Sequence, residues 1–130
     1  MPLLHEGLRM ATERMPKAIK PTTHAVIDYA VAGSFFLMAA LFWRRNRRAA
    51  MGSLICGGAV TANIVLTSYP GGAMDSVSYA THGQVDRGIA GMAAVLPKLM
   101  GFSGEPEARA FSTMALVATA VTSLTDFEKE

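Results

Sequence analysis

Four long stretches of this sequence are apolar and almost free of charge, and they constrain the fold more than any other feature. They cover roughly residues 24–43, 49–68, 82–100 and 108–125. A helix needs about 20 mostly apolar residues to cross the hydrocarbon core of a bilayer. Each stretch approaches that length, so we predict an all-α integral membrane protein in which four transmembrane helices form a bundle.

A soluble, alanine-rich helical bundle is the alternative interpretation. Helices of a soluble bundle carry a polar stripe on their outer face, but the segment AAMGSLICGGAVTANIVL contains no charged residue. Only 17% of the chain is charged, whereas soluble domains average about 25%. These observations favour the membrane, and they make the lipid bilayer the first expected partner. The formal net charge of +2 is too small to indicate a nucleic-acid partner.

One pattern of eleven residues occurs twice in the chain. The segments THAVIDYAVAG and THGQVDRGIAG both read T-H-x-x-x-D-x-x-x-A-G, and the second begins 58 positions after the first. The same offset relates residues in the later apolar stretches, including Thr61 with Thr119 and Thr67 with Thr125. The register therefore spans two helices and their loop, which indicates one helical hairpin written twice.

The repeat divides the chain into a tail and one domain. Residues 22–130 form the predicted four-helix transmembrane domain, with repeat one at residues 22–69 and repeat two at residues 80–127. Residues 1–21 form an amino-terminal tail in which apolar and charged side chains alternate. A short helix lying in the membrane interface would suit that tail, and a partly ordered soluble tail is the alternative.

Both repeats must begin on the same side of the membrane, because each hairpin crosses it twice. The starts of the first and third helices therefore share one layer with the ends of the second and fourth. The polar residues of this layer are His24, Asp28, His82, Asp86, Thr67, Thr125 and Asp126. Further along the first and third helices, Gly33 and Gly91 are small enough to predict close helix packing.

A structural polar layer is the simplest role for these residues. Residues four apart share one face of a helix, so each histidine forms a local pair with the aspartate that follows it. The aspartates would accept hydrogen bonds from Thr67, from Thr125, or from the imidazole of their own or of the other repeat. Such a network satisfies itself and needs no ligand.

A ligand site on the two-fold axis is the competing hypothesis. Two imidazoles and two carboxylates suit Zn²⁺ or a comparable divalent ion, and the candidate ligands are His24, Asp28, His82 and Asp86. Haem held by the two histidines is a further option, as is passage of protons or ions through the cluster. Only Asn63, Thr61 and Thr119 continue a polar track inward, which argues against passage.

No catalytic motif accompanies this layer. The sequence lacks G-x-S-x-G, a P-loop and H-E-x-x-H, which excludes the best-known hydrolytic and phosphoryl-transfer signatures. We therefore expect a structural, interaction or accessory component of the membrane rather than an enzyme. It would act as a homo-oligomer or within a larger membrane complex, and a metal- or haem-binding membrane protein is the alternative.

A dense basic loop bears on orientation. The segment RRNRR, Arg44–Arg48, joins the first two apolar stretches, and short loops rich in Lys and Arg favour the cytoplasmic side. We expect this loop in the cytoplasm and the His/Asp layer on the opposite side. The basic amino-terminal tail keeps the reverse orientation open.

Several motifs resemble those of the SPW-repeat family of small bacterial membrane proteins. The resemblance covers roughly residues 22–127 and includes THGQVDRGIAGM, AVLPKLMGFSGE, LTSYPGG and LTDFE. It implies two transmembrane hairpins in a bacterial inner membrane, without implying an activity. The chain departs from the family where LPK, residues 96–98, stands in place of the Ser-Pro-Trp triplet.

Overall fold

A computed structural model describes residues 18–127 of the chain. Its elements are four helices, namely α2 (Pro21–Phe42), α3 (Arg47–Leu66), α4 (Tyr79–Leu99) and α5 (Ala108–Leu124). The described residues contain no strand and only isolated bridges between extended residues, so the all-α prediction is confirmed. Residues 1–17 of the predicted tail lie outside the described residues.

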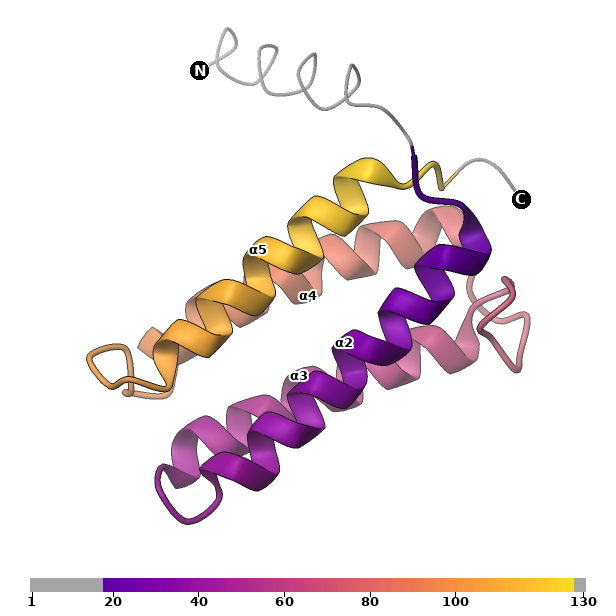
Figure 1. Ribbon diagram of the computed structural model, residues 1–130. Coiled ribbons are helices and arrows are strands. Elements are labelled where there is room, and N and C mark those ends of the chain that lie inside the picture. The colour runs from indigo at the N-terminus through magenta and orange to yellow at the C-terminus, as the bar shows by residue number, and fades with distance from the viewer. Residues whose placement is uncertain (1–17, 128–130) are drawn as a thin grey trace, which may run out of the picture.

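The helices associate mainly as two antiparallel pairs (Figure 1). Helix α2 packs chiefly against α3, helix α4 packs chiefly against α5, and α3 faces α4 across the bundle. The α2–α3 and α4–α5 loops lie at one end of the bundle. The α3–α4 linker and the ends of the described chain lie at the other, which we call the linker end.

Local sequence signals explain where the helices begin and end. The side chain of Asn46 accepts from Ala49 N at the start of α3, and that of Ser78 accepts from Thr81 N at the start of α4; such caps satisfy the free amides of a first turn. Helix α4 ends before Gly101, whose φ of +77° suits a residue without a Cβ.

A contact between the two loops joins the helix pairs at the end opposite the linker. Asn46 Nδ2 donates to Glu105 Oε2 at 2.6 Å and to Glu107 Oε1 at 2.8 Å. The core beside it is aromatic and tightly packed, with Phe111 centred 5.2 Å from Phe102 and 6.4 Å from Phe35. The apolar core thus lies in the middle and the loop end of the bundle, and the polar residues gather at the linker end.

Two of the four predicted transmembrane segments are long and apolar enough to cross a bilayer. Helix α2 reaches a mean hydropathy of 1.9 and α3 reaches 1.7. Helix α5 is shorter, with 17 residues. Helix α4 carries four side chains that can be charged, namely His82, Asp86, Arg87 and Lys98. Many large apolar side chains point outward, among them Val26, Leu37, Leu41, Leu54, Ile55, Val95, Leu99 and Leu116.

The prediction that Gly33 and Gly91 mediate close helix packing is wrong within this chain. Both are exposed, and a Cβ built on either would meet no atom within 4 Å. Close approach occurs instead at Gly57, which lies under the side chains of Phe35 and Phe36, and at Gly83. The sequence spacing identifies the apolar helices, but it does not reveal which small residue faces a neighbour.

These environments predict opposite effects of alanine at two glycines. A Cβ on Gly83 would lie 2.7 Å from the Phe127 ring, so Gly83→Ala should lower the free energy of unfolding by about 1–3 kcal/mol through overpacking. Gly33→Ala should raise it by up to about 1 kcal/mol, because alanine favours the helix and the site is open. Thermal unfolding of the two variants in one detergent checks this, and equal effects would contradict it.

Candidate metal site

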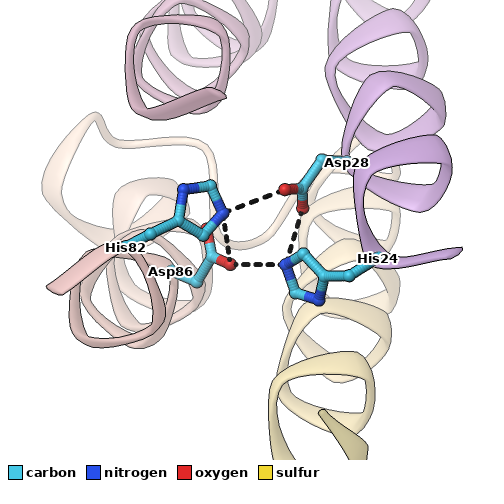
Figure 2. Close-up of side chains that lie close together, drawn as sticks. All are labelled: His24, Asp28, His82 and Asp86. Atoms are coloured by element: carbon cyan, nitrogen blue, oxygen red, sulfur yellow. Dashed lines mark hydrogen bonds and ion pairs between the residues drawn. The ribbon is translucent and has the colours of Figure 1, made fainter. Parts of the chain in front are cut away.

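Two helices bring four ionisable side chains to one point at the linker end. His24 and Asp28 come from the first two turns of α2, and His82 and Asp86 come from the first two turns of α4. Figure 2 shows both imidazoles and both carboxylates pointing toward one another. We call these four residues the His/Asp tetrad.

Each histidine contacts both carboxylates through its Nε2 atom. His24 Nε2 lies 3.2 Å from Asp28 Oδ1 and 3.0 Å from Asp86 Oδ2. His82 Nε2 lies 2.9 Å from Asp28 Oδ2 and 3.2 Å from Asp86 Oδ2. The two contacts between the helices are shorter than the two within a helix. The four contacts form a closed ring (Figure 2). Two of them are the local pairs predicted from the sequence, and the other two join each aspartate to the imidazole of the other repeat, which the sequence had offered as an alternative.

The tetrad is buried. Both histidines are fully inaccessible to solvent, Asp28 is 6% exposed and Asp86 is 9% exposed. Two ionised carboxylates in such a place require positive charge beside them, because an isolated buried charge costs several kcal/mol. The neutral imidazoles alone do not supply it.

A threonine fixes the other nitrogen of each imidazole. His24 Nδ1 lies 2.9 Å from Thr125 Oγ1, and His82 Nδ1 lies 2.7 Å from Thr67 Oγ1. Each threonine hydroxyl donates its own proton to the carbonyl four residues earlier, at Val121 and Asn63 respectively. The hydroxyls therefore act as acceptors, and each Nδ1 carries the donated proton. We assign the tautomer from this direction of donation.

This tautomer leaves both Nε2 atoms directed at carboxylate oxygens. An unprotonated Nε2 presents a lone pair, which repels the lone pairs of a carboxylate. The ring of contacts is therefore favourable only when positive charge lies between its members. Two protons, one on each Nε2, or one divalent cation in the middle would supply the same charge.

Each carboxylate receives one further hydrogen bond. Tyr69 Oη donates to Asp28 Oδ2 at 2.9 Å, and Asn63 Nδ2 donates to Asp86 Oδ1 at 2.9 Å. Burial, together with the nearby Asp28 carboxylate, raises the pKa of Tyr69 well above its usual range. The phenol thus stays protonated and remains a donor. These two partners hold the carboxylates in place, as outer hydrogen bonds commonly do around metal ligands.

Aromatic rings enclose the tetrad on its linker side. The ring of Phe127 is centred 5.1 Å from that of His24, and the ring of Tyr69 is centred 4.8 Å from that of His82. Tyr79 lies 5.9 Å from each imidazole and stacks on Tyr69. Sequence reasoning missed this enclosure, although Tyr69 and Phe127 are also 58 positions apart.

Below the tetrad, toward the core, the space is small and apolar. A cavity of about 20 Å³ lies there, and its walls include both aspartates, Phe35, Val60 and Ile89. That volume holds about one water molecule. No described residue continues a polar track through this cavity toward the loop end, so the arrangement gives no support to the passage of protons or ions.

The remaining members of the predicted layer have different roles from those expected. Thr67 and Thr125 bond to the imidazole of the other helix pair, and not to an aspartate as predicted. Asp126 is half-buried and is not a member of the tetrad. Haem between the histidines is disfavoured, because carboxylate oxygens within 3.2 Å of both Nε2 atoms occupy the space that a porphyrin would need.

The geometry of the tetrad suits one metal ion. One ligand atom from each member lies within 4.8 Å of all the others. In a tetrahedral zinc site the ligands lie about 2.0–2.1 Å from the metal, which sets them about 3.3 Å apart. The four nitrogen–oxygen contacts of 2.9–3.2 Å are close to this spacing. They use both oxygens of Asp28 and one oxygen of Asp86, so an ion at the centre requires a local adjustment that turns one oxygen of each carboxylate toward it.

No protein-family model, curated protein or solved structure matches this chain. The resemblance to the SPW-repeat family stays a prediction from its motifs.

Proposed function

We propose that the protein is a small integral membrane protein that binds one divalent transition-metal ion at the His/Asp tetrad. The observation that carries the proposal is the convergence of four ligand atoms from two helices within 4.8 Å. The ion would tie the α2–α3 pair to the α4–α5 pair at the linker end, because each pair supplies one imidazole and one carboxylate.

Charge favours a divalent ion over a monovalent one. Two carboxylates and two neutral imidazoles carry a total charge of −2, and one divalent cation cancels it inside a buried site. Imidazole nitrogen favours zinc and similar transition metals, whereas Mg²⁺ and Ca²⁺ prefer sites built from oxygen alone. The hydrogen bonds from each Nδ1 to a threonine support this assignment, because metal-bound histidines usually donate from the other ring nitrogen.

The proposed ion has a structural role. Four protein ligands complete a tetrahedral shell and leave no position for a substrate, which is the pattern of structural rather than catalytic zinc. The aromatic rings of Tyr69, Tyr79 and Phe127 further restrict access. The role is thus that of an accessory or interaction component of the membrane, with no reaction at the tetrad.

Membrane insertion is part of the proposal. Helices α2 and α3 are long and apolar enough to cross a bilayer, and the 58-residue register extends the same arrangement to α4 and α5 as a second hairpin. The bacterial inner membrane is the proposed location, with Arg44–Arg48 in the cytoplasm. The hydrocarbon of the bilayer would cover the outward-facing apolar side chains.

The second candidate function is a metal-free ionic lock, by which we mean ion pairs between protonated histidines and ionised aspartates of the tetrad that join the two helix pairs. The separations of 2.9–3.2 Å are also ordinary lengths for hydrogen bonds. With one proton on each Nε2, the tetrad would be neutral and every member would be satisfied. The protein would then join its helix pairs without an ion.

Metal analysis of the purified protein separates the two candidates. After loading with Zn²⁺ and removal of free metal, the wild-type protein should retain about one equivalent. Asp28→Asn with Asp86→Asn should reduce the retained metal at least about tenfold, since loss of metal ligands costs affinity steeply. The readout is the ratio of metal to protein by elemental mass spectrometry.

A matched control comes from the linker. Asp75 is an exposed aspartate away from the tetrad, so Asp75→Asn should retain metal as the wild-type protein does. A folded wild-type protein that retains no Zn²⁺, Fe²⁺, Co²⁺ or Mn²⁺ would overturn the metal proposal and leave the ionic lock. Retention that is unchanged in the double variant would place the metal elsewhere.

A further inference from the structure

The outer face of the α4–α5 pair carries an open groove. Its volume is about 660 Å³, and small side chains form its floor, including Ala90, Gly91, Ala94 and Ala115. Arg87 lies at the end of the groove nearest the tetrad, one residue after Asp86. From Arg87 to Ala94, the helix advances about 10 Å toward the middle of the bundle.

The α2–α3 pair has large apolar residues at two matching positions. At the 58-residue offset, Phe36 corresponds to Ala94 and Leu54 corresponds to Ser112. The Phe36 ring covers Gly57 so closely that a Cβ there would lie 3.1 Å from Phe36 Cε1. The first pair thus fills with its own phenylalanine a space that the second pair leaves open.

The polar atoms along the groove are already satisfied by their own helix. Thr119 Oγ1 donates to Ala115 O at 2.8 Å, and Thr122 Oγ1 donates to Ala118 O at 2.7 Å. Ser112 Oγ also donates to its i−4 carbonyl, at 3.4 Å. These bonds leave methyl and methylene groups to line much of the groove. An apolar chain can therefore occupy it without leaving a donor unpaired.

Arg87 supplies a positive charge at one end of this apolar groove. Its side chain is exposed and forms no ion pair with any residue between 18 and 127. At the corresponding position of α2, Tyr29 donates to Gly71 O at 2.7 Å. Among the described residues, Arg87 thus has no acidic partner at the level of the tetrad, and a guanidinium pairs well with phosphate oxygens.

We propose that this groove binds one phospholipid, with an acyl chain along Gly91 and Ala94 and the phosphate on Arg87. The inference rests on the membrane insertion stated under the proposed function, and it is independent of metal at the tetrad. The positively charged end and the apolar floor match the two parts of a phospholipid in the order in which they occur across one leaflet. A helix of a second copy would leave Arg87 without an anion.

Photo-crosslinking in liposomes tests the proposal. The probe is phosphatidylglycerol with a photoreactive group in one acyl chain, and the labelled peptides are mapped by mass spectrometry. In the wild-type protein, labelling should concentrate on the groove faces of α4 and α5. Ala94→Phe should reduce it to the level found on α2 and α3, and Arg87→Gln should reduce it about tenfold through loss of charge-assisted hydrogen bonds.

Two neighbouring positions give matched controls. Val95 is half-exposed outside the groove, so Val95→Phe adds the same ring without filling it and should label as the wild-type protein does. Lys98→Gln removes a cation from the other end of α4 and should also leave labelling unchanged. Ala94→Phe reproduces the residue of the first pair, and its melting temperature verifies that it folds.

The outcomes separate this proposal from the proposed function. If alkaline carbonate extracts the protein from the liposomes, membrane insertion and the lipid site would be overturned together. Metal retention, measured on the same samples, tests the tetrad independently. If the protein is integrated in the membrane but its labelling is unchanged in both Ala94→Phe and Arg87→Gln, the lipid site alone would be overturned. If a bifunctional protein crosslinker in the same liposomes joins two chains at the groove, and Ala94→Phe abolishes the crosslink, the lipid site would be overturned in favour of a second copy.

Discussion

Asp86→Ala is expected to lower the free energy of unfolding of the metal-free protein by about 3–5 kcal/mol, because it leaves buried charge without a partner. Asp86 Oδ2 contacts both imidazoles, at 3.0 and 3.2 Å, and Oδ1 accepts the hydrogen bond of Asn63. All three groups lose a partner at once. Denaturant unfolding in detergent with a chelator present, followed by the fluorescence of the single tryptophan, Trp43, measures the change.

The control and a double variant make this result specific. Asp75→Ala removes an exposed carboxylate and should change stability by less than about 0.5 kcal/mol. Asp86→Ala combined with His82→Ala removes one acid and one base, so its effect should be smaller than the sum of the two single effects. A loss below about 1 kcal/mol for Asp86→Ala would show that the tetrad holds no paired buried charge.

Metal affinity is expected to rise by up to about 100-fold per pH unit while both Nε2 atoms of the metal-free tetrad are protonated, because binding then displaces two protons. The direction of donation to Thr67 and Thr125 leaves each Nδ1 protonated. In the metal-free tetrad the remaining protons lie on the Nε2 atoms, where the ion must bind. Protons therefore compete more strongly as the pH falls. Competition with a chelating dye at several pH values gives the slope.

A variant that keeps only one tetrad histidine tests how many protons determine the change in metal affinity per pH unit. His24→Gln retains a side chain that accepts hydrogen bonds but removes one displaceable proton, so the affinity should be weaker and should change only about tenfold per pH unit. Calorimetry in two buffers with different ionisation enthalpies counts the released protons directly. An affinity that is independent of pH in the wild-type protein would contradict the protonation assigned to the tetrad.

The sequence predicted the elements and the membership of the site because both depend on spacing. Charge-free runs located the four helices to within a few residues, for example residues 24–43 for α2 (Pro21–Phe42). The 58-residue offset placed His24 and His82 at equivalent helix starts. Connectivity then brought those starts to one end of the bundle, so the shared layer did not depend on packing angles, whereas direct contact between the two pairs did and was left open.

The partners of the tetrad could not be predicted, because they depend on how each helix is rotated about its axis. Thr67 and Thr125 occupy the expected layer, but small rotations decide whether a hydroxyl meets an imidazole or a carboxylate. Asn63 reaches Asp86 from a position that sequence reasoning treated only as part of an inward track. The prediction for Gly33 was wrong for the same reason, since a small residue in an apolar helix can lie on the outer face of the bundle as readily as against a neighbouring helix.

The two supporting donors have a consequence for the equivalence of the repeats. Tyr69 and Asn63 both belong to the first helix pair. The second pair has Phe127 and Val121 at the matching positions, and neither side chain can donate a hydrogen bond to a carboxylate. A dimer of the first hairpin alone would carry two of each donor, and a dimer of the second would carry none. The first helix pair thus supplies both donors, one to its own Asp28 and one to Asp86 of the other pair. Replacing either helix pair by a second copy of the other pair would change the hydrogen-bond donors around both carboxylates.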